Sequence, residues 1–260
     1  MELAYLPLLR TQRDLYRLPL GMDRFREYLD TLIDKAADDI KLPLSGMNPM
    51  GKEHVPAFLD GLISMDAEGA ASAAVDRARA DLAAEPGRYR VCLVATDDLL
   101  GGWTNRYASE LAHLMDQRDL RKRGWMTVPM WTSEAYTPAK AAASVLACIH
   151  RTAYAQRHGY PETLGDILAQ ERAVMAAVPS AAGAAALGRG LDGEEAAYTR
   201  EALRPLYGAS DPPTLIAALF GDEAARQLGH PPLGLSERAG LALARADAVG
   251  GPGRTPDLHG

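Results

Sequence analysis

The densest group of reactive side chains lies in residues 97–106, which read DDLLGGWTNR. The segment begins with Asp97 and Asp98, and adjacent carboxylates can act as general acid or base or ligate a hard cation. It ends with Arg106, whose guanidinium group can hold a carboxylate or phosphate through two parallel hydrogen bonds. We therefore predict that Asp97 and Asp98 are catalytic and that Arg106 binds a small anionic ligand. The carboxylates would admit a divalent cation such as Mg²⁺ as a cofactor, although the sequence does not require one.

The middle of this segment contains uncharged residues that could line a ligand-binding site. Its candidate ligand-binding residues are Gly101, Gly102, Trp103, Thr104 and Asn105. The glycines allow a close approach of the backbone to a ligand, Trp103 offers a flat apolar wall, and Thr104 or Asn105 can cap the next helix. The same residues also fit an ordinary turn between a strand and a helix, with solvated aspartates and Trp103 in the core. The glycine spacing is not that of a nucleotide-binding motif.

A second candidate segment, residues 131–137, follows another predicted strand. Here Glu134 is a candidate catalytic carboxylate that would act together with the aspartates, and Tyr136 is a candidate hydrogen-bond donor to a ligand. The alternative is that Ser133 and Thr137 only cap a helix.

A third candidate segment is the loop of residues 45–55, which contains Asn48, Lys52, Glu53 and His54. Lys52 and His54 are candidate ligand-binding residues. The glycines of the loop would let it hinge as a lid over a substrate. A plain surface loop is the alternative.

Two strands and the helices after them would position these segments. Residues 89–96 form the clearest strand, apolar enough to be buried on both faces, and residues 125–131 form the second. Pro129 predicts that the second strand lies at an edge of the sheet or contains a bulge, because proline cannot donate to a strand ladder. Helices are predicted at residues 105–120 and 137–158, with Thr137 as N-cap of the latter.

This alternation of strands and helices is typical of a parallel βαβ unit. A third strand would come from residues 3–9 or 15–20. In open parallel sheets, ligands bind beyond the carboxyl ends of the strands, where residues 97–106 and 131–137 would lie side by side.

The rest of the chain is predicted to be helical. Before the first strand, helices are expected at residues 22–40 and 56–65 and at 66–84, where Asp66 is the N-cap; after residue 160 they are expected at 161–178, 193–207, 213–220, 222–228 and 236–246. The predicted fold class is therefore α/β, a short and mainly parallel sheet flanked by many helices, with a helical C-terminal extension. The predicted domains are an α/β core with N-terminal helices at 1–178, a flexible linker or loop at 179–192, the helical extension at 193–249 and a disordered tail at 250–260.

Composition narrows the class of protein. The 260 residues carry a net charge of -6, and the densest basic run, residues 118–123, is short, so a nucleic-acid partner is not expected. No apolar stretch is long enough to cross a membrane, and the apolar N-terminus lacks the basic region and cleavage site of a secretory signal. Cys92 and Cys148 make no disulfide framework, which favours the cytoplasm. The six histidines are scattered and form no zinc-binding motif.

Two functions follow from these features. The preferred hypothesis is an enzyme, a hydrolase or transferase, that acts on a small carboxylate- or phosphate-bearing molecule by carboxylate acid–base or metal-assisted chemistry. The alternative is a non-catalytic ligand-binding or assembly protein, a homo-oligomer in which the helical C-terminal third packs on another subunit. The first predicts a site that joins the carboxylates to Arg106, and the second predicts an exposed apolar patch on the last helices.

Overall fold

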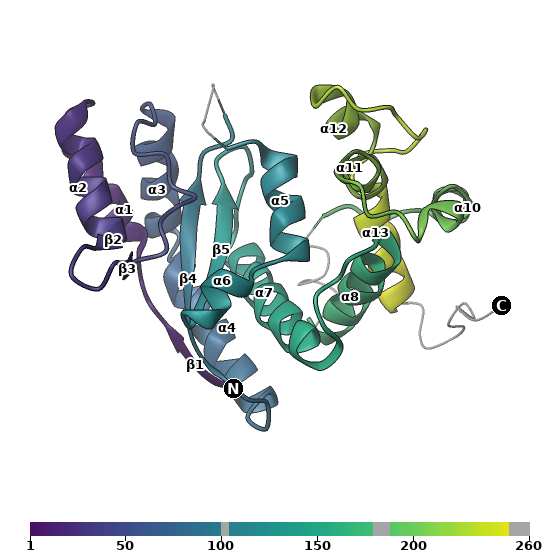
Figure 1. Ribbon diagram of the computed structural model, residues 1–260, viewed down its shortest axis with the longest axis horizontal. Helices are drawn as coiled ribbons and strands as arrows, with labels where there is room; N and C mark the ends of the chain where they lie inside the picture. The colour runs from purple at the N-terminus through teal and green to yellow at the C-terminus, as the bar shows by residue number, and fades with distance from the viewer. Residues whose placement is uncertain (100–103, 179–187, 250–260) are drawn as a thin grey trace. The chain divides into compact units, whose positions relative to one another are not determined.

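The computed structural model describes residues 1–99, 104–178 and 188–249 (Figure 1). It is an α/β structure with a small parallel sheet, many helices and a helical C-terminal part, as the sequence predicted. The chain divides into two compact units. Unit 1 comprises Met1–Arg106 and Gln117–Ile149, and unit 2 comprises Tyr107–Asp116 and His150–Gly260.

Unit 1 contains the sheet. Its strands are β1 (Glu2–Tyr5), β4 (Arg88–Thr96) and β5 (Trp125–Trp131), all parallel and in the order β1-β4-β5. The central strand β4 is buried from Val91 to Thr96, which explains its continuous apolar run. The two predicted strands are confirmed. The third strand comes from the first of the two candidate segments, since residues 15–20 form no strand.

The prediction for Pro129 is also confirmed. This residue lies opposite Val94 in β5, which pairs with β4 on one side and is the edge strand of the sheet. An edge strand needs ladder hydrogen bonds along one side only, so it tolerates a residue that has no N–H group.

Helices α1 (Leu9–Leu15), α2 (Met22–Leu32), α3 (His54–Ser64), α4 (Ala67–Asp81) and α6 (Arg118–Lys122) belong to unit 1. Helix α7 (Pro138–His158) begins there and continues into unit 2. Two predicted caps are confirmed. The Asp66 side chain accepts a hydrogen bond from the Gly69 N–H at the start of α4, and the Thr137 hydroxyl accepts one from the Lys140 N–H at the start of α7.

The predicted helix at residues 22–40 is wrong in its second half. Helix α2 ends at Leu32, and the chain then forms an antiparallel hairpin of β2 (Ile33–Asp34) and β3 (Asp39–Ile40). The Asp34 carboxylate accepts hydrogen bonds from the N–H groups of Ala36 and Ala37 at 3.0 and 3.2 Å. This local turn competes with helix formation, and so residues with helical spacing end up in a hairpin.

The predicted helix at residues 105–120 is divided into two. Helix α5 (Arg106–Met115) buries Leu111 and Leu114, whereas the short helix α6 has no buried residue. The two pieces share no continuous apolar stripe, which is what holds a long helix together in a folded protein.

Unit 2 is helical. Besides most of α5 and the end of α7, it contains α8 (Leu164–Ala177), α10 (Gly193–Leu203), the 3₁₀ helix η1 (Arg204–Leu206), α11 (Pro212–Phe220), α12 (Asp222–Gln227) and α13 (Ala239–Val249). Leu164, Ile167, Leu215 and Phe220 are among the residues of its core. The predicted boundaries at residues 178 and 193 both fall within unit 2. Residues 179–187 and 250–260 lie outside the described residues, so the linker and the tail stay predictions.

None of the helices in the described ranges is both long and apolar enough to cross a membrane.

Candidate functional site

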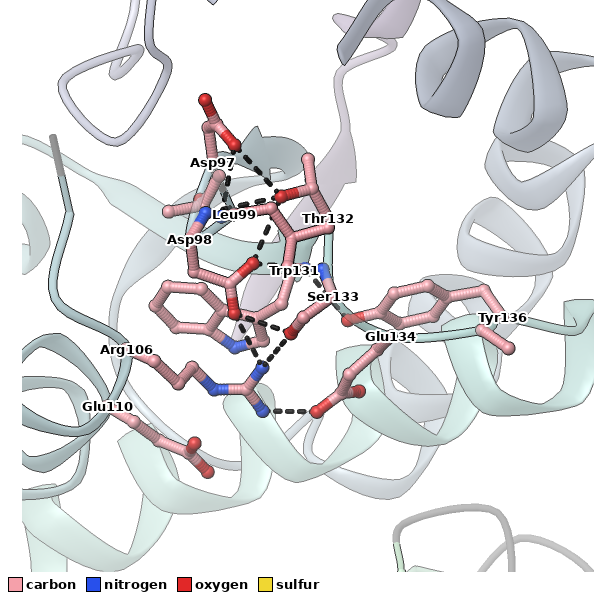
Figure 2. A network of polar contacts seen from close by, with 12 residues as sticks. Asp97, Asp98, Leu99, Arg106, Glu110, Trp131, Thr132, Ser133, Glu134 and Tyr136 are labelled. Carbon is pink, nitrogen blue, oxygen red and sulfur yellow. Dashed lines mark hydrogen bonds and ion pairs between the residues drawn. The ribbon is translucent and has the colours of Figure 1, made fainter. Parts of the chain in front are cut away.

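The candidate site lies in unit 1 at the carboxyl end of the sheet, where β4 and β5 finish side by side. Thr96 pairs with Trp131 in the last register position, and the Thr132 N–H donates to the Thr96 carbonyl at 3.0 Å. The segments that follow the two strands are therefore neighbours (Figure 2). This is the placement that the parallel arrangement predicted.

Asp98 is held by the segment after β5. One carboxylate oxygen accepts from the Ser133 N–H at 2.9 Å and from the Thr132 hydroxyl at 3.0 Å. The other accepts from the Ser133 hydroxyl at 2.6 Å and from Nη1 of Arg106 at 3.3 Å. The side chain is only 2% exposed, so these protein groups replace water around the carboxylate.

Arg106 connects this carboxylate to Glu134. Its Nη2 donates to one oxygen of Glu134, and Nζ of Lys140 pairs with the other at 2.6 Å. The guanidinium group also lies over the Trp131 ring, 4.5 Å from its centroid. Two carboxylates thus balance two cations, and the geometry gives no support to Arg106 as a clamp for a ligand anion.

Glu134 is ionised in this arrangement. Burial raises the pKa of its carboxyl group, but the charges and hydrogen bonds of Arg106 and Lys140 outweigh burial, and the pKa lies below its ordinary value. Glu134 therefore serves as a counter-ion here, and its predicted catalytic role has no support from the geometry.

Asp97 points away from this group and toward the N-terminal part of unit 1 (Figure 2). Its Oδ1 accepts from Nε2 of His54 at 2.8 Å, and its Oδ2 accepts from the side-chain amide of Asn48 at 2.8 Å. The Thr132 hydroxyl and the Leu99 N–H also donate to Oδ1, at 3.1 and 3.3 Å. Burial raises the pKa of Asp97, but these hydrogen bonds outweigh it and lower the pKa overall, so the carboxylate is ionised at neutral pH.

The loop before α3 brings Asn48 and His54 to Asp97, and it is packed in place. Leu44 and Met47 are fully buried, and the Tyr16 hydroxyl donates to the Asn48 carbonyl. Gly46 lies so close to β4 that a Cβ atom there would be 3.1 Å from Oγ1 of Thr96. These contacts favour a fixed loop over the hinged lid that the sequence suggested.

His54 is the first residue of α3, and its ring orientation follows from its partner. An ionised Asp97 can only accept, so Nε2 of His54 carries a proton. In the neutral ring the lone pair is therefore on Nδ1. This atom is buried and has no hydrogen-bond partner among the described residues.

The carboxylates do not fit a Mg²⁺ site. Every oxygen of Asp97 and Asp98 already accepts a hydrogen bond from a protein donor, and the charge of Arg106 beside Asp98 would repel a cation. Within the described ranges, no group of three or more His, Cys, Asp or Glu side chains could hold a metal ion.

The structure thus joins five predicted residues in one network, which consists of His54, Asp97, Asp98, Arg106 and Glu134.

The other predicted site residues lie outside this network. Tyr136 accepts a hydrogen bond from the Trp131 N–H at 2.9 Å and packs against Phe58, which indicates a structural role. Lys52 is exposed, and Thr104 and Asn105 lie just before α5. The remaining three, Gly101, Gly102 and Trp103, lie outside the described residues.

Sequence reasoning did not assign roles to three residues that complete the network. Thr132 bonds both aspartates, and its place directly after β5 was the available signal. Asn48 reaches Asp97, 49 positions away, and only the folded chain brings this pair together. Lys140 pairs with Glu134, which is close to it in the sequence.

Comparisons with protein-family models, with curated protein sequences and with solved structures gave no match to this chain.

Proposed function

We propose that this chain is an enzyme that acts on a small molecule at the carboxyl end of the sheet in unit 1, with His54 as its general acid and base. The observation that carries the proposal is the 2.8 Å hydrogen bond from Nε2 of His54 to the buried carboxylate of Asp97. A histidine whose ring is oriented by an ionised carboxylate is a common arrangement for proton transfer in enzymes.

The proton is exchanged at Nδ1 of His54. In the neutral ring, the Nδ1 lone pair accepts a proton from a hydroxyl group or a water molecule at the reacting centre. The ring then carries a positive charge that faces the Asp97 carboxylate, which stabilises it without taking the proton itself. The oxygen that gave up the proton forms a bond to the carbonyl or phosphoryl centre, the bond from that centre to the leaving group breaks, and the same proton is transferred to the leaving group. Hydrolysis and group transfer both need such a step, and they are the reaction classes that we propose.

Asp97 is a positioning residue in this scheme. Asn48 and Thr132 hold its carboxylate in place, and it holds the His54 ring in turn. The group formed by Asp98, Arg106, Glu134 and Lys140 is balanced in charge and links the ends of β4 and β5 to the start of α7. We assign it the role of a rigid support for the site.

Turnover of simple chromogenic substrates would test this function. p-Nitrophenyl esters and p-nitrophenyl phosphate should be assayed with the wild type, His54→Gln and Asp97→Asn. His158→Gln is the matched control, because His158 is exposed and lies at the end of α7 in unit 2. We expect His54→Gln to lower kcat/KM by about 10²- to 10⁴-fold, which is the usual contribution of a general acid–base group.

Asp97→Asn should lower kcat more than it raises KM, because it changes the ring's orientation and not the binding of substrate. The control should retain wild-type activity. Wild-type turnover that survives in His54→Gln would show that the proposal is wrong, and so would a wild type that turns over none of these compounds.

The alternative function, assembly through the C-terminal third, has less support. The apolar residues of α11 and α13, such as Leu215, Leu219 and Leu243, are buried in the core of unit 2 itself. The packing of these helices therefore does not require a second subunit.

A further inference from the structure

Arg24 is a buried cation without a carboxylate partner among the described residues. It lies in the first turn of α2 and is only 7% exposed. Its Nε and Nη2 donate to the Leu18 carbonyl at 2.8 and 2.5 Å, and its Nη1 donates to the Pro49 carbonyl at 3.4 Å. The guanidinium group also lies 5.2 Å from the centroid of the Tyr16 ring. In the part of the chain that the structure describes, no Asp or Glu side chain forms an ion pair with it.

Three partly buried arginines of this protein do have such partners. Arg106 pairs with Asp98 and Glu134, Arg151 pairs with Glu171, and Arg238 pairs with Glu110. Burial of a charge is costly unless an opposite charge compensates it. Arg24 departs from this pattern, since neutral carbonyl groups and an aromatic ring surround it.

Arg24 also keeps donors for a further partner. A guanidinium group has more N–H donors than the three hydrogen bonds to Leu18 and Pro49 use. In addition, α2 begins at Met22 without a side-chain cap, so the N–H groups of its first turn add positive potential beside Arg24.

One loop connects the guanidinium group of Arg24 to the His54 site. The loop that accepts its hydrogen bond at Pro49 contains Asn48 as the preceding residue, and Asn48 donates to Asp97, the partner of His54. Arg24 and the Asp97–His54 pair therefore bind the same short loop. The pKa of Tyr16, raised mainly by burial, is raised further by the charge of Asp97 and lowered by that of Arg24, which indicates that both charges act on one hydroxyl group.

We infer that Arg24 binds the anionic group of the substrate, a carboxylate or a phosphate, while His54 acts on the reacting group of the same molecule. The inference rests on the function proposed for His54, and it names the substrate class as small anions. An anion at Arg24 would supply the missing counter-charge and accept the remaining N–H groups, ideally through two parallel hydrogen bonds. The anion-binding role that the sequence suggested for Arg106 thus belongs to a different arginine.

Calorimetric titration with inorganic phosphate and with acetate tests this inference and distinguishes the two kinds of anion. The proteins to compare are the wild type, Arg24→Met, Arg24→Lys and Arg26→Gln. Arg26 is the matched control, since it lies on the same helix but is 68% exposed and pairs with Asp23. We expect the wild type and Arg26→Gln to bind at least one of the anions equally well. Arg24→Met should bind it about 10- to 100-fold more weakly, as expected for loss of hydrogen bonds to a charged group.

Arg24 also donates to the Leu18 and Pro49 carbonyls, so Arg24→Met can fail to fold. In that case Arg24→Lys supplies the test. Lysine keeps the positive charge but loses the planar guanidinium group, so we expect its affinity for the anion to lie between those of the wild type and Arg24→Met. Circular dichroism and thermal melting would establish that each variant is folded. Wild-type affinity in a folded Arg24 variant would overturn the inference, and so would a wild type that binds neither anion.

The His54→Gln protein separates this inference from the proposed function. It should bind the anion as the wild type does and lack turnover. If the Arg24 variants bind normally while His54→Gln has lost turnover, only the inference about Arg24 is wrong. If His54→Gln keeps its turnover, the proposed function is wrong, whatever Arg24 binds.

Discussion

The carboxylates of Asp97 and Asp98, adjacent in the chain, point to different sides of the site and are joined by one hydroxyl group. Oγ1 of Thr132 lies 3.1 Å from Oδ1 of Asp97 and 3.0 Å from Oδ1 of Asp98. Beyond this shared contact, Asp97 binds His54 at the start of α3, and Asp98 binds Arg106 at the start of α5. The acidic pair therefore connects the end of β4 to both helix starts.

Thr132→Val should destabilise the protein by about 1–2 kcal/mol. Valine keeps the shape of threonine but removes the hydroxyl group that donates to the aspartates and accepts from the Asp98 N–H at 3.2 Å. Urea denaturation would measure the change. Thr31→Val is the matched control, because the Thr31 hydroxyl donates to the Glu27 carbonyl in an exposed hydrogen bond. Equal stability of the two variants would contradict the role given to Thr132.

Arg106→Met should cost about 3 kcal/mol of stability, because it leaves the buried Asp98 carboxylate without its cation. Glu134→Gln should cost less, about 1 kcal/mol, since Glu134 is partly exposed. The double variant should be more stable than the sum of the two losses predicts, because the Arg106–Glu134 contact can be lost only once. Additive losses in a double-mutant cycle would show that this ion pair contributes nothing.

Stability should fall with acid because the pKa values of Asp97 and Glu134 are lowered in the folded protein. A carboxyl group with a lowered folded pKa contributes its full stability above the unfolded pKa, which is about 4, and loses it as the pH falls through the folded pKa. The free energy of unfolding should therefore decrease as the pH falls below about 4. Asp97→Asn should be less stable at pH 7 and should decline less steeply in acid than the wild type. A curve parallel to that of the wild type would mean that Asp97 is not proton-linked to folding.

Gln12→Met should cost about 2–4 kcal/mol, because the Gln12 side chain completes the edge of β4. Strand β1 ends at Tyr5, opposite Val91. Past that point, the fully buried Gln12 amide donates to the Leu93 carbonyl at 3.0 Å and accepts from the Ala95 N–H at 2.8 Å. Methionine fills the same space and leaves both backbone groups unpaired. Hydrogen exchange at the Ala95 amide should accelerate in this variant, and an unchanged rate would contradict the prediction.

Local patterns determined much of the fold. The apolar run of residues 89–96 between breakers predicted a buried strand, which the structure confirms. Pro129 predicted that the next strand lies at an edge or contains a bulge, and the structure places it at the edge. The same logic placed Asp97 and Asp98 at the carboxyl end of the sheet, because the residue after a parallel strand must lie there. These properties depend on residues a few positions apart, which a sequence displays directly.

At residues 33–40 the helical spacing of apolar residues predicted a helix, whereas the structure has a hairpin. The apolar residues Ile33 and Ile40 fit a helical spacing, but they pair across two short strands because the Asp34 side chain binds the backbone of the turn. Two local structures compete here, and periodicity alone does not rank them.

The roles of the charged residues were decided by tertiary structure. Arg106 is neutralised by Glu134, 28 positions away. Arg24 has no carboxylate partner within residues 1–99, 104–178 and 188–249, although the chain contains 34 acidic residues. His54 meets Asp97 across 43 positions. By itself the sequence placed Asp97, Asp98 and Glu134 at the end of the sheet, because they directly follow its strands. Only the folded chain decided which charges meet, because electrostatic contacts act through space and carry no signature in the order of the residues.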